Sequence, residues 1–522
     1  MQLDKVSLAE SHAFTPFFLD YIQEHDNLKP FYGRFPRPEN FKAQIEEKEQ
    51  SFPVENRKVL VDSLRKQYEG LKLSSVLEDN ISKLEQSKTF TVTTGHQLNI
   101  FTGPMFFVFK IVTVINTCKR LKEQYPDYNF VPVYWMASED HDYEEIKYFK
   151  LYGKKYTWET EQKGAVGRFN TKGLDKLATE IPGENPIFKT AYTKQKTLAA
   201  AGRYYVNELF GSMGVVTIDA DNGALKAEFK KVIREDIIDQ VTKPIVDKTN
   251  NALEQLGYKP QVFCRDINFF HLDNNGRNRL EKEGEGYKVV DTDLIFSKSD
   301  LESKIENQPE QFSPNVILRP LYQEMVLPNI AYVGGPAEVI YWLQLKEVFI
   351  NFKTPFPILM PRNFGMIVDH EVSRKFGKTG LALKDLFEEK NIIFNHWVLA
   401  NTSHNLRTTS EQKAAGRIFE ELKSRASTID TTLSTFVAAA QKRNNTDLEK
   451  IEKKMMRAEK RLHTDRLRQI EAVKDILFPN GSLQERTDSF LNFYHKDPEF
   501  IESLAKLFDP FDFQFNILSY TE

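Results

Sequence analysis

The feature that most restricts the fold of this sequence is a set of short apolar runs that alternate with longer stretches of helical periodicity. The runs are rich in β-branched and aromatic residues, and they occupy positions 89–95, 130–137, 214–220, 330–335 and 356–362. Strands that alternate with helices predict βαβ units around a parallel sheet. Because the runs are apolar almost throughout, we expect helices to cover both faces of this sheet. The sequence therefore predicts an α/β fold.

The length of 522 residues exceeds what one simple core holds, so we expect two or three units. The first unit is predicted to span 1–379 and to contain the parallel sheet. Its N-terminal part, 1–88, has a mostly helical pattern, whereas the segments near 150–212 and 250–312 are more polar and less regular. We interpret these two segments as insertions between core strands.

The region 380–480 shows the spacing of a coiled coil, with apolar residues three or four positions apart and charged residues between them. The apolar positions are Ile418, Leu422, Ala426, Ile429, Leu433, Phe436, Ala440, Leu448, Ile451, Met455, Ala458 and Leu462. A polar break at 443–447 predicts the turn between two long helices of an antiparallel hairpin. The apolar seam is longer than one hairpin needs, so we predict a homodimer through this all-α domain. The segment 481–522 ends in an aromatic tail that is predicted to pack back on the body.

The composition restricts the location and the partners of the chain. A formal net charge of −3 gives no bulk basic excess that would indicate a nucleic-acid partner. The two cysteines, Cys118 and Cys264, form neither a disulfide framework nor a Cys-x-x-Cys pair, which favours a reducing cytoplasm. The most apolar stretch, 105–118, is interrupted by Lys110 and is too short to span a membrane. We therefore expect a cytoplasmic protein with no membrane partner.

The first apolar run ends in residues suited to ligand binding, because ligands of open parallel sheets bind beyond the carboxyl ends of the strands. The candidate substrate- or anion-binding residues here are Gly95, His96, Gln97, Asn99, Thr102 and Gly103. Pro104 suits the first position of a helix, whose free N–H groups favour a phosphate or carboxylate. We therefore predict one anion-binding cradle made of residues 95–97 and this helix start. The alternative is a loop in which His96 only caps or packs.

The second apolar run ends in a histidine flanked by acids, in the order Asp140, His141, Asp142. A carboxylate beside an imidazole fixes its tautomer and raises its basicity, so His141 is the candidate general base. We place Gln97 with these three residues as the predicted catalytic set. One alternative is a helix start whose acids complement the helix dipole. The other is a metal site of His96, His141 and one of the aspartates, but ligand spacing typical of metal sites is absent, so we expect no metal.

A third group of candidates surrounds the fourth and fifth apolar runs. Gly334 and Gly335 would let a ligand approach the backbone, and Glu338 follows in the first turn of a predicted helix. Arg319 and Arg362 carry guanidinium groups that suit a carboxylate or a phosphate. The alternatives are an ordinary salt bridge for each arginine and a helix-dipole role for Glu338.

Several long stretches are similar to those of one family: TTGHQLNIFTGPMFFVFK, VPVYWMASEDHDYEEI, SPNVILRPLYQE, AYVGGPAEVIYWLQLK and LFPNGSLQER. They resemble the cysteine ligases of bacillithiol biosynthesis, the BshC family. The resemblance implies a Rossmann-like core with connecting insertions and a coiled coil used for dimerisation. It also implies the last step of the pathway, which joins cysteine to glucosaminyl-malate through an amide. The family usually has glutamine where this chain has His96, which implies hydrogen bonding rather than proton transfer for that residue.

The leading hypothesis is therefore a ligase whose small-molecule substrates are cysteine and glucosaminyl-malate. An alternative enzyme is a synthetase-like nucleotidyl transferase that acts on another amine, and the sequence leaves open whether a nucleotide such as ATP or ADP takes part. The alternative outside enzymes is a coiled-coil nucleic-acid-binding or scaffold protein that uses the cations of 450–461. Such charge runs are usually solvated helix faces, so we expect no nucleic acid.

Overall fold

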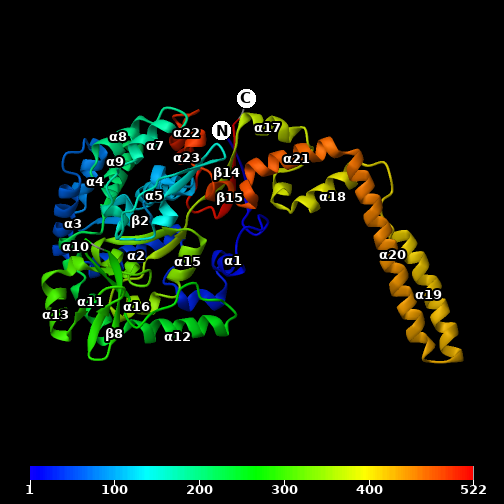
Figure 1. The fold of residues 1–522 in the computed structure, drawn as a ribbon, viewed down its shortest axis with the longest axis horizontal. Helices are drawn as coiled ribbons and strands as arrows, with labels where there is room; N and C mark the ends of the chain where they lie inside the picture. The colour runs from blue at the N-terminus through cyan, green and yellow to red at the C-terminus, as the bar shows by residue number, and fades with distance from the viewer. Residues whose placement is uncertain (275, 521–522) are drawn as a thin grey trace.

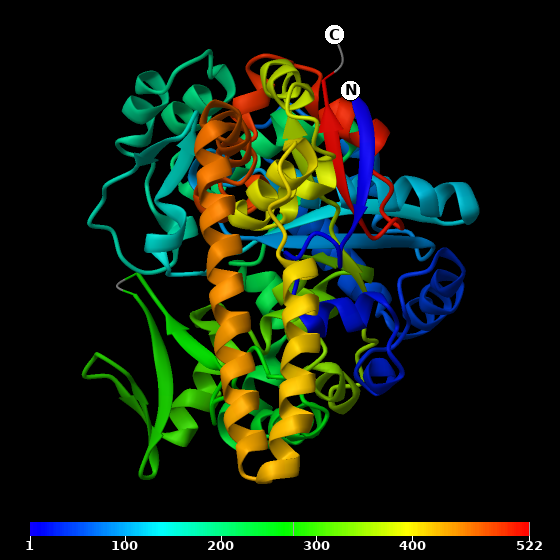
Figure 2. The ribbon, with the colours of Figure 1, turned by 90° about the vertical axis from the view of Figure 1, so that its right-hand side faces the viewer.

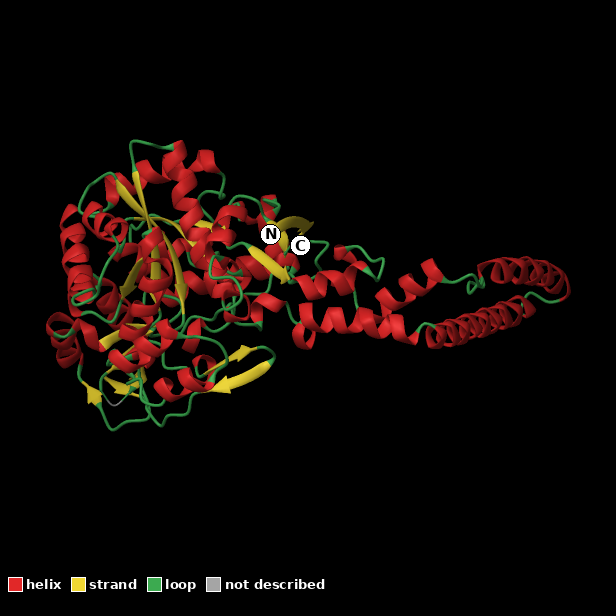
Figure 3. Cartoon of the chain, turned by 90° about the horizontal axis from the view of Figure 1, so that it is seen from above, coloured by secondary structure: helices red, strands yellow, loops and turns green. Residues whose placement is uncertain are grey.

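The computed structural model describes residues 1–274 and 276–520. Residue 275, in the second predicted insertion, and residues 521–522, in the predicted C-terminal segment, lie outside the described residues. The chain forms a body and one long helical arm that projects from it (Figures 1 and 3).

A five-stranded parallel sheet forms the centre of the body, in the order β13-β12-β2-β3-β6. Its strands are β2 (Thr89–His96), β3 (Asn129–Met136), β6 (Val216–Asp219), β12 (Asn329–Gly334) and β13 (Ile358–Pro361). They coincide with the five apolar runs, and the predicted α/β fold with a parallel sheet is confirmed. The chain places β3 and β6 on one side of β2 and then β12 and β13 on the other, so the strand order reverses between β2 and β12.

The helix that follows β2 is α5 (Phe106–Gln124), which is buried along most of its length and packs against β2 and β3. The sequence predicted that this helix begins at Pro104, but it begins at Phe106. Before it, Ile100–Thr102 form a short 3-10 turn, and Gly103 takes a positive φ of 64°. A Cβ atom at Gly103 would lie 2.7 Å from the Asn99 Cβ, so this turn requires glycine.

The N-terminal part and two insertions surround the central sheet. The N-terminal part contains β1 (Gln2–Ser7), α1 (Pro16–Ile22), α2 (Phe41–Ser51), α3 (Val54–Gln67) and α4 (Ser75–Lys83). The first insertion, between β3 and β6, contains α6 (Tyr143–Ile146), β4 (Tyr148–Leu151), β5 (Lys154–Thr157), α7 (Leu174–Glu180), α8 (Pro186–Lys194) and α9 (Leu198–Phe210). The second insertion, between β6 and β12, supplies part of the candidate site described below.

The second insertion combines helices with an antiparallel sheet in the order β10-β9-β8-β7-β11. Its helices are α10 (Gly223–Ala227), α11 (Lys230–Asp239), α12 (Thr242–Gln255), α13 (Lys298–Asn307) and α14 (Arg319–Val326). Its strands are β7 (Phe269–Leu272), β8 (Arg277–Glu283), β9 (Gly286–Val289), β10 (Ile295–Phe296) and β11 (Phe312–Pro314). After β12 the chain forms α15 (Pro336–Trp342) and α16 (Lys346–Asn351) before it enters β13.

A small sheet in the order β1-β15-β14 lies near the base of the arm. Strand β15 (Gln514–Ser519) pairs antiparallel with β1 and parallel with β14 (Phe364–Val368). Apart from the two long helices of the arm, the α-helices that follow β14 are α17 (His370–Gly377), α18 (Lys390–Asn401), α21 (Thr464–Leu477), α22 (Leu491–Tyr494) and α23 (Phe500–Leu507). The last strand therefore joins the first residues of the chain to the start of the helical region.

The arm consists of α19 (Thr409–Ile429) and α20 (Leu433–Leu462), which lie side by side (Figure 2). The predicted turn at 443–447 is wrong, because these residues lie inside α20 and the chain turns at 430–432. Asparagine and aspartate cost a helix only about 0.7 kcal/mol or less each, so packing between the two helices outweighs them. At the true turn, Asp430 Oδ1 accepts hydrogen bonds from the N and Oγ1 atoms of Thr432, both at 2.8 Å.

A buried ion pair fastens the C-terminal segment to the body. Arg362 Nη2 lies 2.6 Å from Glu485 Oε1, both side chains are almost completely buried, and Glu485 Oε2 accepts a hydrogen bond from Gly365 N at 2.8 Å. Glu485→Gln should lower the stability by about 3–5 kcal/mol, because it leaves the Arg362 charge buried without its counter-ion. The measurement is the melting temperature of the wild type and of Glu485→Gln. The matched control is Glu371→Gln, which breaks an exposed pair with Lys375 and should leave the melting temperature nearly unchanged; equal shifts for the two variants would contradict the prediction.

Candidate active site at the carboxyl edge of the sheet

A cavity of about 520 Å³ opens at the carboxyl ends of β2, β3 and β12. This is the point where the strand order reverses, which is where open α/β sheets bind ligands. The predicted residues that line it are Gly95, His96, Gln97, Asp140, Arg319 and Glu338. The sequence analysis therefore located this edge of the sheet, and the structure brings together residues from three separate strand ends and α14.

An ion pair between Lys110 and Glu338 forms one side of the cavity. Lys110, from α5, is almost fully buried, donates to Gly95 O at 2.9 Å and lies 2.5 Å from Glu338 Oε2. Glu338 also accepts hydrogen bonds from Tyr332 Oη at 2.8 Å and from Gly335 N at 2.7 Å. The start of α15 is therefore satisfied by its own glutamate, and Gly334 and Gly335 do not line the cavity.

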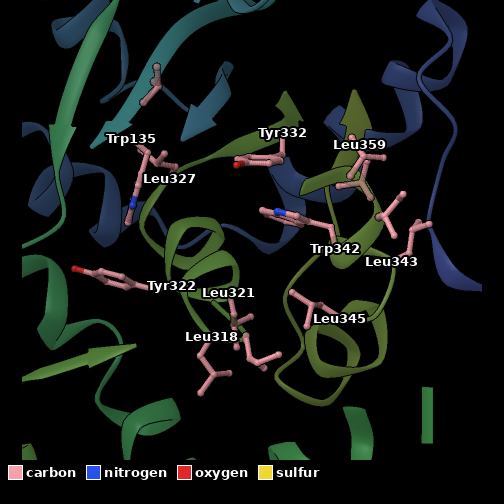
Figure 4. Close-up of a cluster of buried hydrophobic side chains, with 14 of the residues drawn as sticks. Trp135, Leu318, Leu321, Tyr322, Leu327, Tyr332, Trp342, Leu343, Leu345 and Leu359 are labelled. Carbon is pink, nitrogen blue, oxygen red and sulfur yellow. The ribbon is translucent and has the colours of Figure 1, made fainter. Parts of the chain in front are cut away.

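Arg319 contributes a positive charge to this cavity. Its Nη1 donates to Gln323 Oε1 at 3.1 Å and its Nη2 to Tyr341 Oη at 3.4 Å. In the part of the chain that the structure describes, no carboxylate lies within 4.0 Å of its guanidinium. The guanidinium lies over the rings of Tyr332 and Trp342. These two rings are stacked on each other with centroids 4.4 Å apart, as Figure 4 shows for their side chains. Such a guanidinium donates its hydrogen bonds best to a carboxylate, here one that a ligand would supply.

His96 reaches the cavity as a neutral ring. It lies against Phe106 and Phe107, with ring centroids 5.2 and 5.3 Å away, and among the described residues its buried Nε2 has no hydrogen-bond partner. Burial lowers the pKa of His96 to about 3, and the nearby Lys110 charge adds to this effect. The ring therefore stays uncharged at physiological pH and is suited to hydrogen bonding.

We predict that His96→Gln keeps ligand affinity within about 1 kcal/mol of the wild type, since an amide also donates and accepts hydrogen bonds. The measurement is the dissociation constant of the amine substrate by calorimetry at pH 6 and pH 8. Both proteins should respond to pH alike, because His96 carries no charge at either value. A loss of affinity of more than a hundredfold in a variant with an unchanged melting temperature would show that the imidazole itself is required.

Gln97 and Asp140 form a second side of the cavity. Gln97 Nε2 donates to Asp140 Oδ2 at 3.0 Å, and Asp140 Oδ1 accepts a hydrogen bond from His141 N at 2.7 Å. Glu139, the preceding residue, also lines the cavity and is buried. The sequence SEDHDYEE therefore points two successive carboxylates toward the cavity.

His141 does not line this cavity, and its contacts do not suit the predicted role of general base. It is exposed and lines a neighbouring hollow, and Arg277 Nη1 lies 2.9 Å from its Nδ1. Because arginine only donates, Nδ1 accepts this bond and the ring hydrogen is on Nε2, which leaves no free lone pair. Burial and the Arg277 charge also lower the pKa of His141. The geometry indicates instead that His141 orients Arg277, whose side chain lines the cavity.

The predicted anion cradle at the start of α5 is wrong. Met105 N donates to Asp488 O at 2.7 Å, so a carbonyl of the C-terminal segment covers the start of α5. Asn99 Nδ2 donates to Glu145 O at 3.0 Å, and Asp142 caps the short helix α6 by accepting from Glu145 N at 3.3 Å. The predicted residues that do not line the cavity are Asn99, Thr102, Gly103, His141, Asp142, Gly334, Gly335 and Arg362. Arg362 binds Glu485, which is the salt-bridge alternative.

The cavity residues that the sequence analysis missed include Lys110, Glu139, Arg277 and Tyr332. Lys110 could have been found, since a lysine within a helix of buried apolar residues needs a buried partner. Arg277 had no such signal, because its position depends on how the antiparallel sheet of the second insertion folds over the edge of the central sheet. The described residues contain no cluster of His, Cys, Asp or Glu that could hold a metal ion, so the alternative site with His96 and His141 is not assembled.

The doubly covered parallel sheet, with acids and bases gathered in a cavity at its switch point, defines a Rossmann-like enzyme domain joined to a coiled-coil domain. The chain belongs to the BshC family of bacillithiol biosynthesis. Residues 1–363 match the family model described as the N-terminal Rossmann-like domain of bacillithiol biosynthesis BshC, and residues 365–520 match its C-terminal coiled-coil domain. The family that the sequence resembled is therefore confirmed.

Curated relatives match the chain over nearly its whole length. The cysteine ligase BshC of Cytophaga hutchinsonii is 39% identical and the alignment covers 99% of each chain. The protein of the same name from Flavobacterium psychrophilum is 39% identical over 100% of each chain, and that from Chloroherpeton thalassium is 28% identical over 95% of this chain and 94% of its own. Within the described residues, no helix has both the length and the apolar character that a membrane crossing requires.

Proposed function

We propose that this chain joins the carboxyl group of cysteine to the amino group of glucosaminyl-malate through an amide, as a ligase of bacillithiol biosynthesis. Membership of the family and the names of its relatives support this reaction. The observation that carries it is the set of charged groups in the cavity: among the described residues Arg319 has no carboxylate within 4.0 Å, and Glu139 and Asp140 supply carboxylates near Arg277. A substrate with carboxylates at one end and an amine at the other matches this distribution.

The malate carboxylates of the substrate fit the side of the cavity formed by Arg319. A guanidinium fork binds a carboxylate through two parallel hydrogen bonds, and the aromatic rings of Tyr332 and Trp342 hold this fork in place. The sugar hydroxyls then face His96 and Gln97, which donate and accept hydrogen bonds without net charge. The amine is directed toward Glu139 and Asp140.

The test is calorimetric binding of glucosaminyl-malate and of glucosamine to the purified protein. Loss of the malate should weaken binding by about tenfold or more, because a hydrogen bond to a charged group contributes about 1.5–3 kcal/mol. Equal affinities for the two compounds, or no binding of glucosaminyl-malate, would refute the proposed substrate.

We also propose that the protein is a homodimer through the arm. Apolar side chains of both arm helices remain exposed in the single chain, with Ile418 59%, Ile429 82%, Phe436 67% and Leu462 72% exposed. An apolar stripe on paired helices is buried in a stable coiled coil, and a second copy of the same arm supplies the matching surface. The two cysteines, Cys118 and Cys264, are buried and unpaired, which supports the cytoplasm as the location.

A further inference from the structure

We propose that Glu139 holds the amino group of the substrate and accepts its proton. The inference rests on the proposed function and names the residue that performs its proton transfer. It replaces the role that the sequence suggested for His141.

One carboxylate oxygen of Glu139 is held by a buried lysine, and the side chain lines the cavity. The residue follows β3, is only 8% exposed and lines the cavity. Its Oε1 lies 2.5 Å from Lys226 Nζ, and Lys226 is fully buried behind it and also donates to Phe312 O at 2.7 Å. Among the described residues Lys226 is the one hydrogen-bond partner of this carboxylate. The anchored group therefore keeps acceptor capacity for a substrate cation.

The neighbouring carboxylates are already engaged. Asp140 accepts hydrogen bonds from Gln97 and from the backbone of His141. Glu338 accepts from Tyr332 and Gly335 in addition to its pair with Lys110. Glu139 is therefore the carboxylate of this cavity that an incoming ammonium group meets with the least competition.

The charges around Glu139 come from several elements. Titratable and charged groups that face it are Lys226 and Asp221 after β6, Arg277 on β8, Arg168 in the first insertion and Tyr322 on α14. Burial raises the pKa of Glu139 to about 7, the negative charge of Asp221 adds to the rise, and Lys226 and Arg277 oppose it. A base that titrates near the working pH is the most effective proton acceptor.

The proposed step is one proton transfer. An N–H bond of the substrate ammonium breaks, an O–H bond forms on Glu139, and the nitrogen keeps the electron pair, so the amine becomes a neutral nucleophile. Glu139 changes from a carboxylate to a neutral acid, while Lys226 keeps its proton and its hydrogen bonds. The cavity opening then lets the proton leave to solvent.

The test is proton release during binding of glucosaminyl-malate, measured by calorimetry at pH 7 in two buffers of different ionisation enthalpy. Burial raises the pKa of Glu139 to about 7, so a part of the free protein carries a proton on this group at this pH. The bound ammonium favours the ionised form, so the wild type should release more protons per ligand than Glu139→Gln. Glutamine has the same shape and still accepts the Lys226 hydrogen bond. The control Glu144→Gln, at an exposed acid of the same segment, should match the wild type.

The outcomes separate this inference from the proposed function. If the wild type does not bind glucosaminyl-malate, the proposed function fails. If it binds and Glu139→Gln releases as many protons as the wild type, the assignment of Glu139 is overturned and the function stands. The double variant Glu139→Gln with Lys226→Met removes both buried charges, and it replaces the single variant in this measurement if the single variant does not fold. Both the single and the double variant should bind glucosaminyl-malate, and neither should restore the thiol product in a strain that lacks the wild-type chain. Restoration of the product by either variant would also overturn the assignment of Glu139.

Discussion

Arg319→Met is expected to weaken the binding of glucosaminyl-malate by about 30-fold to several thousandfold. Truncating one partner of a buried, hydrogen-bonded charge pair costs about 2–5 kcal/mol, because the ligand carboxylate is left desolvated without a donor. Arg319 lies on α14 beside Tyr332 and Trp342 and has no close protein counter-ion among the described residues, so no other side chain replaces its charge at that position. The dissociation constant from calorimetry measures the effect.

Two further substitutions make this result specific. Arg319→Lys keeps the charge but loses the fork, and its affinity should lie between those of the wild type and Arg319→Met. Arg279→Met removes a partly exposed arginine of β8 that pairs with Glu281 and does not line the cavity, and its affinity should equal that of the wild type. If Arg319→Met binds normally with an unchanged melting temperature, the cavity does not bind the malate carboxylates through this residue.

The second large effect concerns the arm, where Ile418→Glu combined with Phe436→Glu should convert a dimer into a monomer. The chain mass is 60.7 kDa, so light scattering at micromolar concentration should give twice this mass for the wild type and 60.7 kDa for the variant. Each large apolar side chain buried in the interface contributes about 1.5–3 kcal/mol, and a buried glutamate reverses that gain. Glu421→Lys, at an exposed charged position of α19, is the control and should remain dimeric. A monomeric wild type, or a dimeric double variant, would contradict the proposed assembly.

The central sheet was predictable because its strands are buried on both faces, so each apolar run carries a direct signal. The start of α5 was misplaced because Gly103 takes a positive φ and Met105 N donates to Asp488 O, a carbonyl far away in the sequence. The arm turn was misplaced because the polar residues 443–447 resemble a break but cost a helix little. In both places tertiary contacts outweigh the local pattern.

The sequence predicted where the candidate site lies, but it predicted only some of the residues that line it. Strand-end position identified Gln97 and Asp140, because the carboxyl ends of parallel strands share one edge. In the structure His141 accepts a hydrogen bond from Arg277, and Arg362 forms an ion pair with Glu485. Both partners come from segments far away in the sequence. Adjacent acids such as Glu139 and Asp140 differ in burial and partners, which no single-sequence pattern reports.

The most direct test of the central claim is the small-molecule thiol profile of a strain that lacks this chain. The strain should contain no thiol made of cysteine joined to glucosaminyl-malate, and glucosaminyl-malate should accumulate. Expression of the wild-type chain should restore the thiol, whereas Arg319→Met should leave the amine precursor in place. A strain that lacks the chain and still makes this thiol at the normal level would contradict the ligase function.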